Sequence, residues 1–370
     1  MLFSERGTII KNMNIVRRTI IIFLIPILLL LNSCASYQES ASLERMSIGL
    51  LLANTDGVRW DRDEGYFMAK ADEFGVEVLT RVAGGDQEEQ NRQARELIGE
   101  GVGVLVVFPV KPESSGPIVE RAHESDIPVL AYDNMIRDVE LDLYAAPDRE
   151  LSGYLQAWAL LDRSTGGGSI IFGSLEDPWC ARLINQGQLR AVKEWEEREG
   201  EIIPILHDSV ISPPTVDFIR RLVEKALKVT SRQGEEIGTI MASDDLIAFE
   251  VIEVLKDEGL VGLVPVGGMG ATVAGCRRII HGTQAVTLYT PPREIGVAVF
   301  RAAVRLAGGV DPEEIIEVLK YPERTVNNGS EEVPALLVAP VIVTRSNMIE
   351  TVVMDGLYTV EEIYGSGRAE

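Results

Sequence analysis

Short apolar runs alternate with amphipathic stretches along this chain, and that alternation constrains its fold more than any other feature. The clearest apolar run is VGVLVVF at 102–108, which has the length of a strand and contains no polar side chain. Such runs occur in parallel sheets that are covered by helices on both faces. The stretches before and after it, at 86–101 and 116–125, have the pattern of helices. The sequence therefore predicts an α/β fold with a doubly wound sheet.

The alternation occurs in two consecutive series, which predicts two lobes. In the first series we expect strands at 48–53, 76–82, 102–108, 128–132 and 141–145, and helices at 61–74, 86–101 and 116–125. In the second we expect helices at 150–161, 181–200, 215–229 and 246–259, and strands at 168–173, 202–206, 236–242 and 263–266. The alternative, one open sheet of about ten strands, is wider than most sheets. Each series predicts one Rossmann-like lobe.

Three crossings between the lobes are expected, near 146–149, near 289–293 and after a helix at 294–307. They divide the chain into an N-terminal lobe (47–147 plus 290–325) and a C-terminal lobe (148–289 plus 326–362). The segments joining them would act as a hinge.

The N-terminal segment has the pattern of a bacterial lipoprotein signal. Basic residues precede an apolar run at 20–31, and the sequence Leu-Asn-Ser-Cys ends at Cys34. The run is too short to cross a bilayer of roughly 30 Å as a helix, but it suits the core of a cleavable signal. We expect a signal peptide at 1–33, lipidation of Cys34 and a polar linker at 34–46. The alternative is a membrane anchor that is never cleaved. Either way, the remainder works outside the cytoplasm.

Composition excludes several classes of function. Asp and Glu number 57 against 35 Lys and Arg, a net charge of −22 that disfavours nucleic acid as a partner. The three histidines are far apart, so neither a zinc site nor another cofactor is expected. Cys180 and Cys276 could form a disulfide in an oxidising compartment, although two distant cysteines define no framework. With no catalytic motif present, we expect a monomeric binding protein and no enzyme.

Polar residues follow the predicted strands and indicate a ligand cleft. In open α/β sheets, ligands bind beyond the carboxyl ends of the strands. The residues at these ends are 54–56, 109–111, 133–134, 174–176, 243–245 and 268–270. Carboxylates and amides together with aromatic faces suit a neutral, polyhydroxylated ligand. Each residue also has an ordinary structural explanation, as a helix cap, a turn or a packing contact; together they favour a cleft.

Several segments carry a resemblance to a known family. They are Arg59-Trp60 with Asp63, LAYDNMI at 130–136, QGQ at 186–188, ASDD at 242–245, GCRRIIHGTQ at 275–284 and LYTP at 288–291. In order and spacing they resemble the periplasmic sugar-binding proteins of ABC importers, most closely the D-xylose-binding branch. This resemblance implies a type I periplasmic binding protein fold that closes on a monosaccharide and delivers it to an ABC permease. No cofactor is implied.

The ligand contacts of the family carry over in part. Trp60 and Asp133 match the family pattern, whereas Asn134, Gly270 and Thr290 stand where the family has charged residues. The complete set of expected ligand contacts is Trp60, Asp63, Lys111, Asp133, Asn134, Glu176, Trp179, Asp244, Asp245, Gly270 and Thr290. The expected ligand is a xylose-like pentose. Two alternatives remain open: a cleft rebuilt for another small polar ligand, or a sensor that signals to a membrane receptor.

Overall fold

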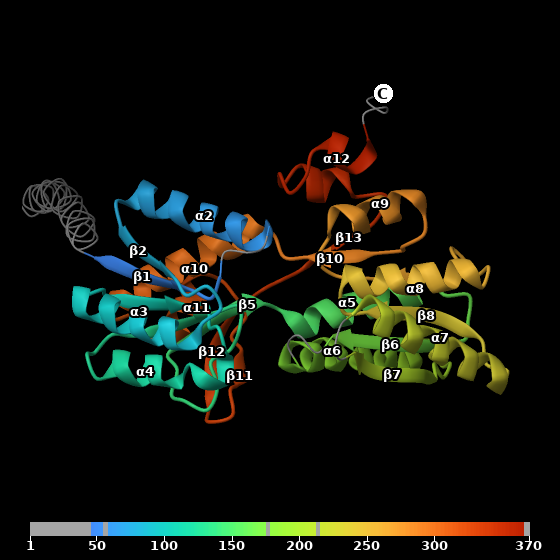
Figure 1. Ribbon diagram of the computed structural model, residues 1–370, viewed down its shortest axis with the longest axis horizontal. Helices are drawn as coiled ribbons and strands as arrows, with labels where there is room; N and C mark the ends of the chain where they lie inside the picture. The colour runs from blue at the N-terminus through green and yellow to red at the C-terminus, as the bar shows by residue number, and fades with distance from the viewer. Residues whose placement is uncertain (1–45, 55–57, 175–177, 212–214, 366–370) are drawn as a thin grey trace, which may run out of the picture.

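The protein consists of two α/β lobes that lie side by side and are joined by three connecting segments (Figure 1). The computed structural model describes residues 46–54, 58–174, 178–211 and 215–365. The expected signal peptide, the lipidation site at Cys34 and Glu176 lie outside these ranges. Within the described part of the chain, no helix combines the length and the apolar content that crossing a membrane requires.

The N-terminal lobe contains a seven-stranded sheet with the strand order β11-β12-β5-β4-β3-β1-β2. Its strands are β1 (Ser47–Leu52), β2 (Glu77–Val82), β3 (Val104–Val107), β4 (Val129–Tyr132), β5 (Leu143–Pro147), β11 (Thr325–Asn327) and β12 (Glu332–Val338). Neighbouring strands are parallel, except that β11 runs antiparallel to β12. A short 3-10 helix, η1 (Pro112–Ser114), follows β3.

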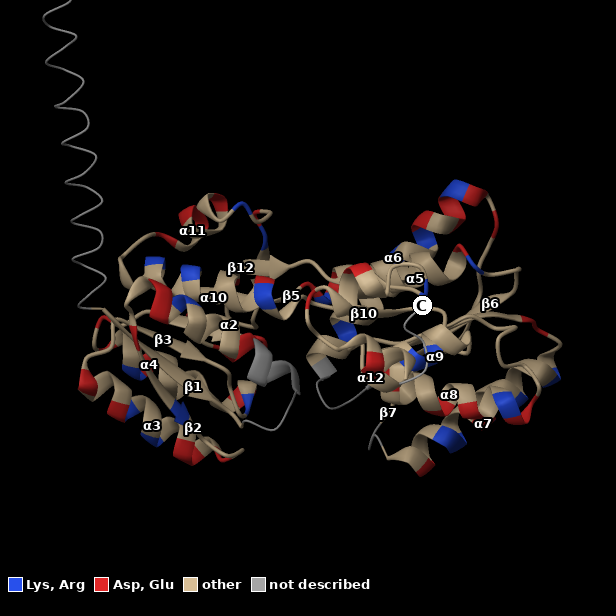
Figure 2. Ribbon diagram, turned by 90° about the horizontal axis from the view of Figure 1, so that it is seen from above, with Lys and Arg blue, Asp and Glu red and all other residues tan. Residues whose placement is uncertain are grey.

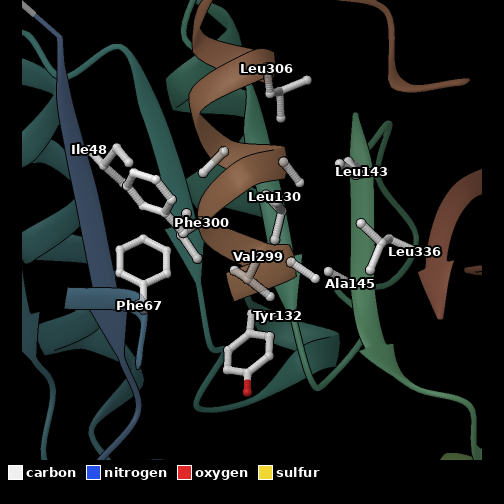
Figure 3. Close-up of a cluster of buried hydrophobic side chains, with 14 of the residues drawn as sticks. Ile48, Phe67, Leu130, Tyr132, Leu143, Ala145, Val299, Phe300, Leu306 and Leu336 are labelled. Carbon is white, nitrogen blue, oxygen red and sulfur yellow. The ribbon is translucent and has the colours of Figure 1, made fainter. Parts of the chain in front are cut away.

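Successive residues of the central strands supply two separate cores, as expected for a sheet that is buried on both faces. Leu50 and Leu52 pack under α2 (Val58–Phe74), α10 (Pro292–Ala307) and α11 (Pro312–Val318). Leu51 faces α3 (Gln87–Glu100) and α4 (Gly116–His123). In the first core, the rings of Phe67 and Phe300 lie edge to face with centroids 5.5 Å apart (Figure 3).

The C-terminal lobe contains a four-stranded parallel sheet with the order β7-β6-β8-β9. Its strands are β6 (Gly168–Ser174), β7 (Ile205–Ile211), β8 (Ile237–Ala242) and β9 (Val266–Gly267). The helices α5 (Arg149–Leu161) and α6 (Pro178–Glu199) cover one face, while α7 (Val216–Gln233) and α8 (Asp245–Asp257) cover the other.

A smaller cluster completes this lobe. The strands β10 (Thr287–Tyr289) and β13 (Val341–Val343) pair antiparallel, beside α9 (Val273–His281). The described part of the chain ends with a π-helical turn, η2 (Ile349–Val353), and α12 (Val360–Tyr364), which packs on α9. Cys276 is buried in this cluster, far along the chain from Cys180 in α6, and the two form no disulfide.

The chain passes between the lobes at three places, and the third differs from the prediction. The first two passages follow β5, before α5, and β10, before α10. The third was expected after the helix at 294–307, with the N-terminal lobe ending at residue 325. Instead β12 pairs in parallel with β5, placing Ala335 opposite Tyr144, so residues 326–338 belong to the N-terminal lobe. The crossing lies at 339–340, between β12 and β13.

Candidate ligand-binding site

A cavity of about 400 Å³ lies where the three crossings meet the C-terminal lobe. Three prolines at the crossings line it: Pro147 ends β5, Pro292 begins α10, and Pro340 lies between β12 and β13. Its other walls include residues that follow the strands of the C-terminal lobe: Ser243, Met269, Gly270 and Thr290. Volume and position fit a site for a small molecule at the carboxyl edge of an α/β sheet.

Gly270 and Thr290 are the two predicted contacts that line this cavity directly. Gly270 follows β9 and has φ of 107°, a backbone conformation that glycine adopts without steric cost. Its amide donates to the carbonyl of Leu288 at 2.7 Å, which ties the loop after β9 to β10. Thr290 is the first residue after β10, at the start of the second crossing.

Asp133 stands at the end of β4 in a strained conformation. Its φ is 63°, in the left-handed region that is uncommon for residues other than glycine. The Tyr144 hydroxyl donates to the Asp133 carbonyl at 2.8 Å, and the Arg149 Nη2 donates to its Oδ1 at 2.9 Å. Asn134 follows, half-buried like Asp133. Strained residues held by such contacts are frequent at ligand sites.

Asp63 lies on α2, nearly fully buried below the end of β4. The hydroxyl of Tyr132 donates to Asp63 Oδ2, so the helix and the strand are joined at this point. Trp60 belongs to the same helix, and its side chain lies outside the described part of the chain.

Lys111 is exposed on the loop after β3, and that loop is positioned by glutamines of α3. Gln87 Oε1 accepts from the Lys111 amide at 2.8 Å. Gln90 donates to the Phe108 carbonyl at 2.8 Å and accepts from the Val110 amide at 2.9 Å. The sequence analysis did not identify these glutamines. The available signal was that polar amide side chains lie on the buried face of a predicted helix, where they need hydrogen-bond partners.

Trp179 brings α6 of the C-terminal lobe into contact with the N-terminal lobe. Its ring lies edge to face with Tyr144 of β5, with centroids 6.0 Å apart, and it packs against the core beneath α3 and α4. The residue is half-buried, so part of its surface faces away from this contact.

The neighbouring carboxylates Asp244 and Asp245 have different environments. Asp244 caps α8, accepting from the Ile247 amide at 2.7 Å, and burial raises the pKa of its carboxyl. Asp245 is buried inside the lobe. Its carboxylate accepts hydrogen bonds from Thr272 (amide 2.8 Å, hydroxyl 2.9 Å), from Gln284 Nε2 (2.8 Å) and from the Thr287 hydroxyl (3.0 Å). Both Asp245 oxygens thus hold α8 to the start of α9 and to β10, so this carboxylate is occupied by contacts within the lobe.

Arg149 and Tyr289 also line the cavity, although neither was among the expected contacts. Tyr289 donates from its hydroxyl to Asp355 Oδ2, and burial raises the pKa of the phenol. Arg149 is the first residue of α5, directly after the first crossing. The sequence could have indicated Arg149 as a contact, because it is a basic residue at a predicted crossing.

Residues 48–311 match the sequence profile of the periplasmic binding protein domain family. The chain belongs to this family. A D-xylose-binding periplasmic protein of Escherichia coli K12 is 31% identical over 338 residues, which cover 90% of this chain and 98% of that protein. A protein with the same description from Haemophilus influenzae is 30% identical over 342 residues, covering 91% and 98%.

A solved structure shows that the fold is shared. A carbohydrate transporter solute binding protein from Chloroflexus aurantiacus, in complex with D-glucose, superposes with a TM-score of 0.70. It is 23% identical, and the match covers 86% of this chain and 98% of that one. The resemblance to periplasmic sugar-binding proteins and the α/β fold with two lobes, both predicted from the sequence, are confirmed. These relatives are solute-binding proteins, not enzymes.

Proposed function

We propose that this protein is the solute-binding component of a carbohydrate ABC importer and captures a monosaccharide in the cavity at its hinge. The observation that carries the proposal is the cavity itself, which is lined by residues at or next to all three crossings and by residues that follow strands. The D-xylose-binding relatives make a xylose-like pentose the leading ligand.

The lining of the cavity has the chemistry that a neutral sugar requires. Tyr289 and Tyr358 supply ring faces, and Ser243, Thr272 and Thr290 supply hydroxyl groups. Aromatic faces pack against the C–H surface of a sugar, while hydroxyl groups both donate and accept hydrogen bonds. Its volume, about 400 Å³, falls within the usual range for small-molecule sites.

Binding would be coupled to closure of the lobes about the three crossings. Asp133 and Asn134 lie on the N-terminal lobe, whereas Gly270 and Thr290 lie across the hinge, at the cavity. A ligand that contacts both groups binds the closed state more tightly than the open state and so shifts the population toward closure. The closed surface would then be recognised by the permease, with the protein monomeric, outside the cytoplasm and tethered by lipid at Cys34.

Isothermal titration with D-xylose, D-ribose, L-arabinose, D-glucose and xylitol tests the proposal. We expect at least one of these compounds to bind at one site per chain. The radius of gyration measured by small-angle X-ray scattering should decrease when it binds. Asp133→Asn should weaken binding roughly 10-fold or more, because it loses a charged acceptor. The matched exchange Asp86→Asn, at the exposed N-cap of α3, should leave affinity unchanged. If the folded protein gives no heat of binding with any of these compounds, the proposal is contradicted.

A further inference from the structure

An ion pair joins the two lobes beside the first crossing. Asp133 follows β4 of the N-terminal lobe, and Arg149 opens α5 of the C-terminal lobe. Arg149 Nη2 lies 2.9 Å from Asp133 Oδ1, and the two side chains are only 22% and 16% exposed. Partial burial strengthens such a pair relative to one in open solvent.

Arg149 also lines the ligand cavity, where it is the one charged side chain among the described lining residues. Among the described residues that line the cavity, all the others are apolar or neutral polar. The next residue toward the N-terminus, Asp148, caps α5 by accepting from the Leu151 amide at 2.9 Å. The arginine therefore projects from the ordered first turn of a helix, which limits the positions its guanidinium can reach.

We propose that Arg149 is the specificity-determining cation of the ligand site, with Asp133 as the residue that positions it. This inference rests on the proposed function. A guanidinium is planar and can donate two parallel hydrogen bonds, so it suits two adjacent oxygens of a sugar. Asp133 orients the guanidinium from the opposite lobe, and closure brings the sugar, Arg149 and Asp133 into one network.

A second ion pair at the same crossing provides a matched control. Arg324, which precedes β11 in the N-terminal lobe, pairs with Asp148 and lies 3.7 Å from Glu150 of α5. It too joins the lobes across the first crossing. Unlike Arg149, it does not line the cavity. Loss of Arg324 should therefore alter the hinge without altering which hydroxyl groups of the sugar are recognised.

The test compares D-xylose with its 2-deoxy, 3-deoxy and 4-deoxy derivatives by isothermal titration. In the wild type, removal of a hydroxyl that Arg149 contacts should weaken binding roughly 10- to 100-fold, since hydrogen bonds to charged groups are strong. In Arg149→Gln that penalty should fall below about 3-fold, because the charged partner is gone. Arg149→Lys, which keeps the charge but not the planar fork, should give an intermediate penalty.

Arg324→Gln should keep the full penalty and shift the affinity for all four compounds by one common factor. Circular dichroism melting establishes that each variant is folded, and Arg149→Lys serves as the second variant if Arg149→Gln is not. If D-xylose binds but Arg149→Gln retains the wild-type pattern of penalties, this inference is overturned and the proposed function stands. If the folded wild type binds none of the sugars, the proposed function is overturned, and this inference with it.

Discussion

At the residue scale, two adjacent carboxylates show how strongly environment decides a role. Asp244 and Asp245 follow the same strand, and both were expected to contact a ligand. Asp244 is the N-cap of α8 and has an extended backbone, so its side chain turns back to accept from the Ile247 amide. Asp245 is the first helical residue, and its side chain is buried inside the lobe. Only the tertiary structure reveals that the Asp245 carboxylate already accepts hydrogen bonds from Thr272, the N-cap of α9, from Gln284, between α9 and β10, and from Thr287 of β10.

Asp244 supports a prediction about pH. Burial raises the pKa of its carboxyl in the folded state above the ordinary value. The folded state therefore holds this proton more tightly than the unfolded state, so stability falls as pH rises through the interval between the two pKa values. Asn caps helices as well as Asp but does not titrate. The Tm gain of Asp244→Asn over wild type should grow between pH 4 and pH 7.

Thermal melts at several pH values measure this effect. The same exchange at the exposed cap, Asp86→Asn, reports what replacing a capping carboxylate does at the surface, and the difference between the variants isolates burial. A gain that shrinks with rising pH would refute the prediction.

At the element scale, α5 and α6 pack so closely that no side chain fits at two glycines where they meet. Gly153 of α5 lies against α6, where an added Cβ would come within 1.9 Å of the Ile184 carbonyl oxygen. Reciprocally, a Cβ on Gly187 would come within 1.9 Å of the Glu150 carbonyl oxygen. Because backbone atoms are met in both cases, the helices would have to separate to accept any side chain.

Gly187→Ala should therefore lower the free energy of unfolding by about 1–3 kcal/mol, although alanine favours helix. The matched control is Gly99→Ala on α3, where an added Cβ meets no atom within 4 Å. That exchange should raise the free energy of unfolding by about 0.4–1 kcal/mol. Urea unfolding of both variants measures the difference, and a neutral or stabilising Gly187→Ala would disprove close packing of α5 on α6.

At the scale of the whole molecule, the acidic surface bears on the proposed tethering at Cys34. Asp and Glu lie on the outer helices of both lobes, including α3 and α8 (Figure 2), in a chain with a net charge of −22. Anionic lipid surfaces repel such a body. Residence at a membrane would therefore depend on a covalent lipid and a polar linker rather than on surface attraction.

Cys34 supplies the corresponding prediction. The full chain, expressed in a bacterium, should incorporate a labelled fatty acid and fractionate with membranes. Cys34→Ala should carry no label, because the acceptor sulfur is gone. Mass spectrometry of the wild type should find Cys34 as the first residue. An intact N-terminus without label would support the uncleaved anchor instead.

Local sequence pattern by itself determined the two series of strands and helices, and with them the α/β fold of two lobes. Apolar runs of strand length and helical periodicity are patterns among neighbouring residues, so they can be recognised without a structure. Most expected elements overlap observed ones; the strand expected at 202–206 is β7 at Ile205–Ile211, where polar residues of an edge strand interrupt the apolar run. Two of the contacts predicted from the sequence, Gly270 and Thr290, line the cavity in the structure, and their contact with a ligand stays a prediction.

Tertiary structure alone decided the third crossing, the burial of Asp245 and the pairing of Asp133 with Arg149. Each depends on segments that are distant in the sequence: β12 returns to β5, α9 and β10 close over α8, and β4 meets the start of α5. Such contacts are selected by the free energy of the complete packed fold. No local periodicity encodes them, since the residues that meet share no pattern along the chain.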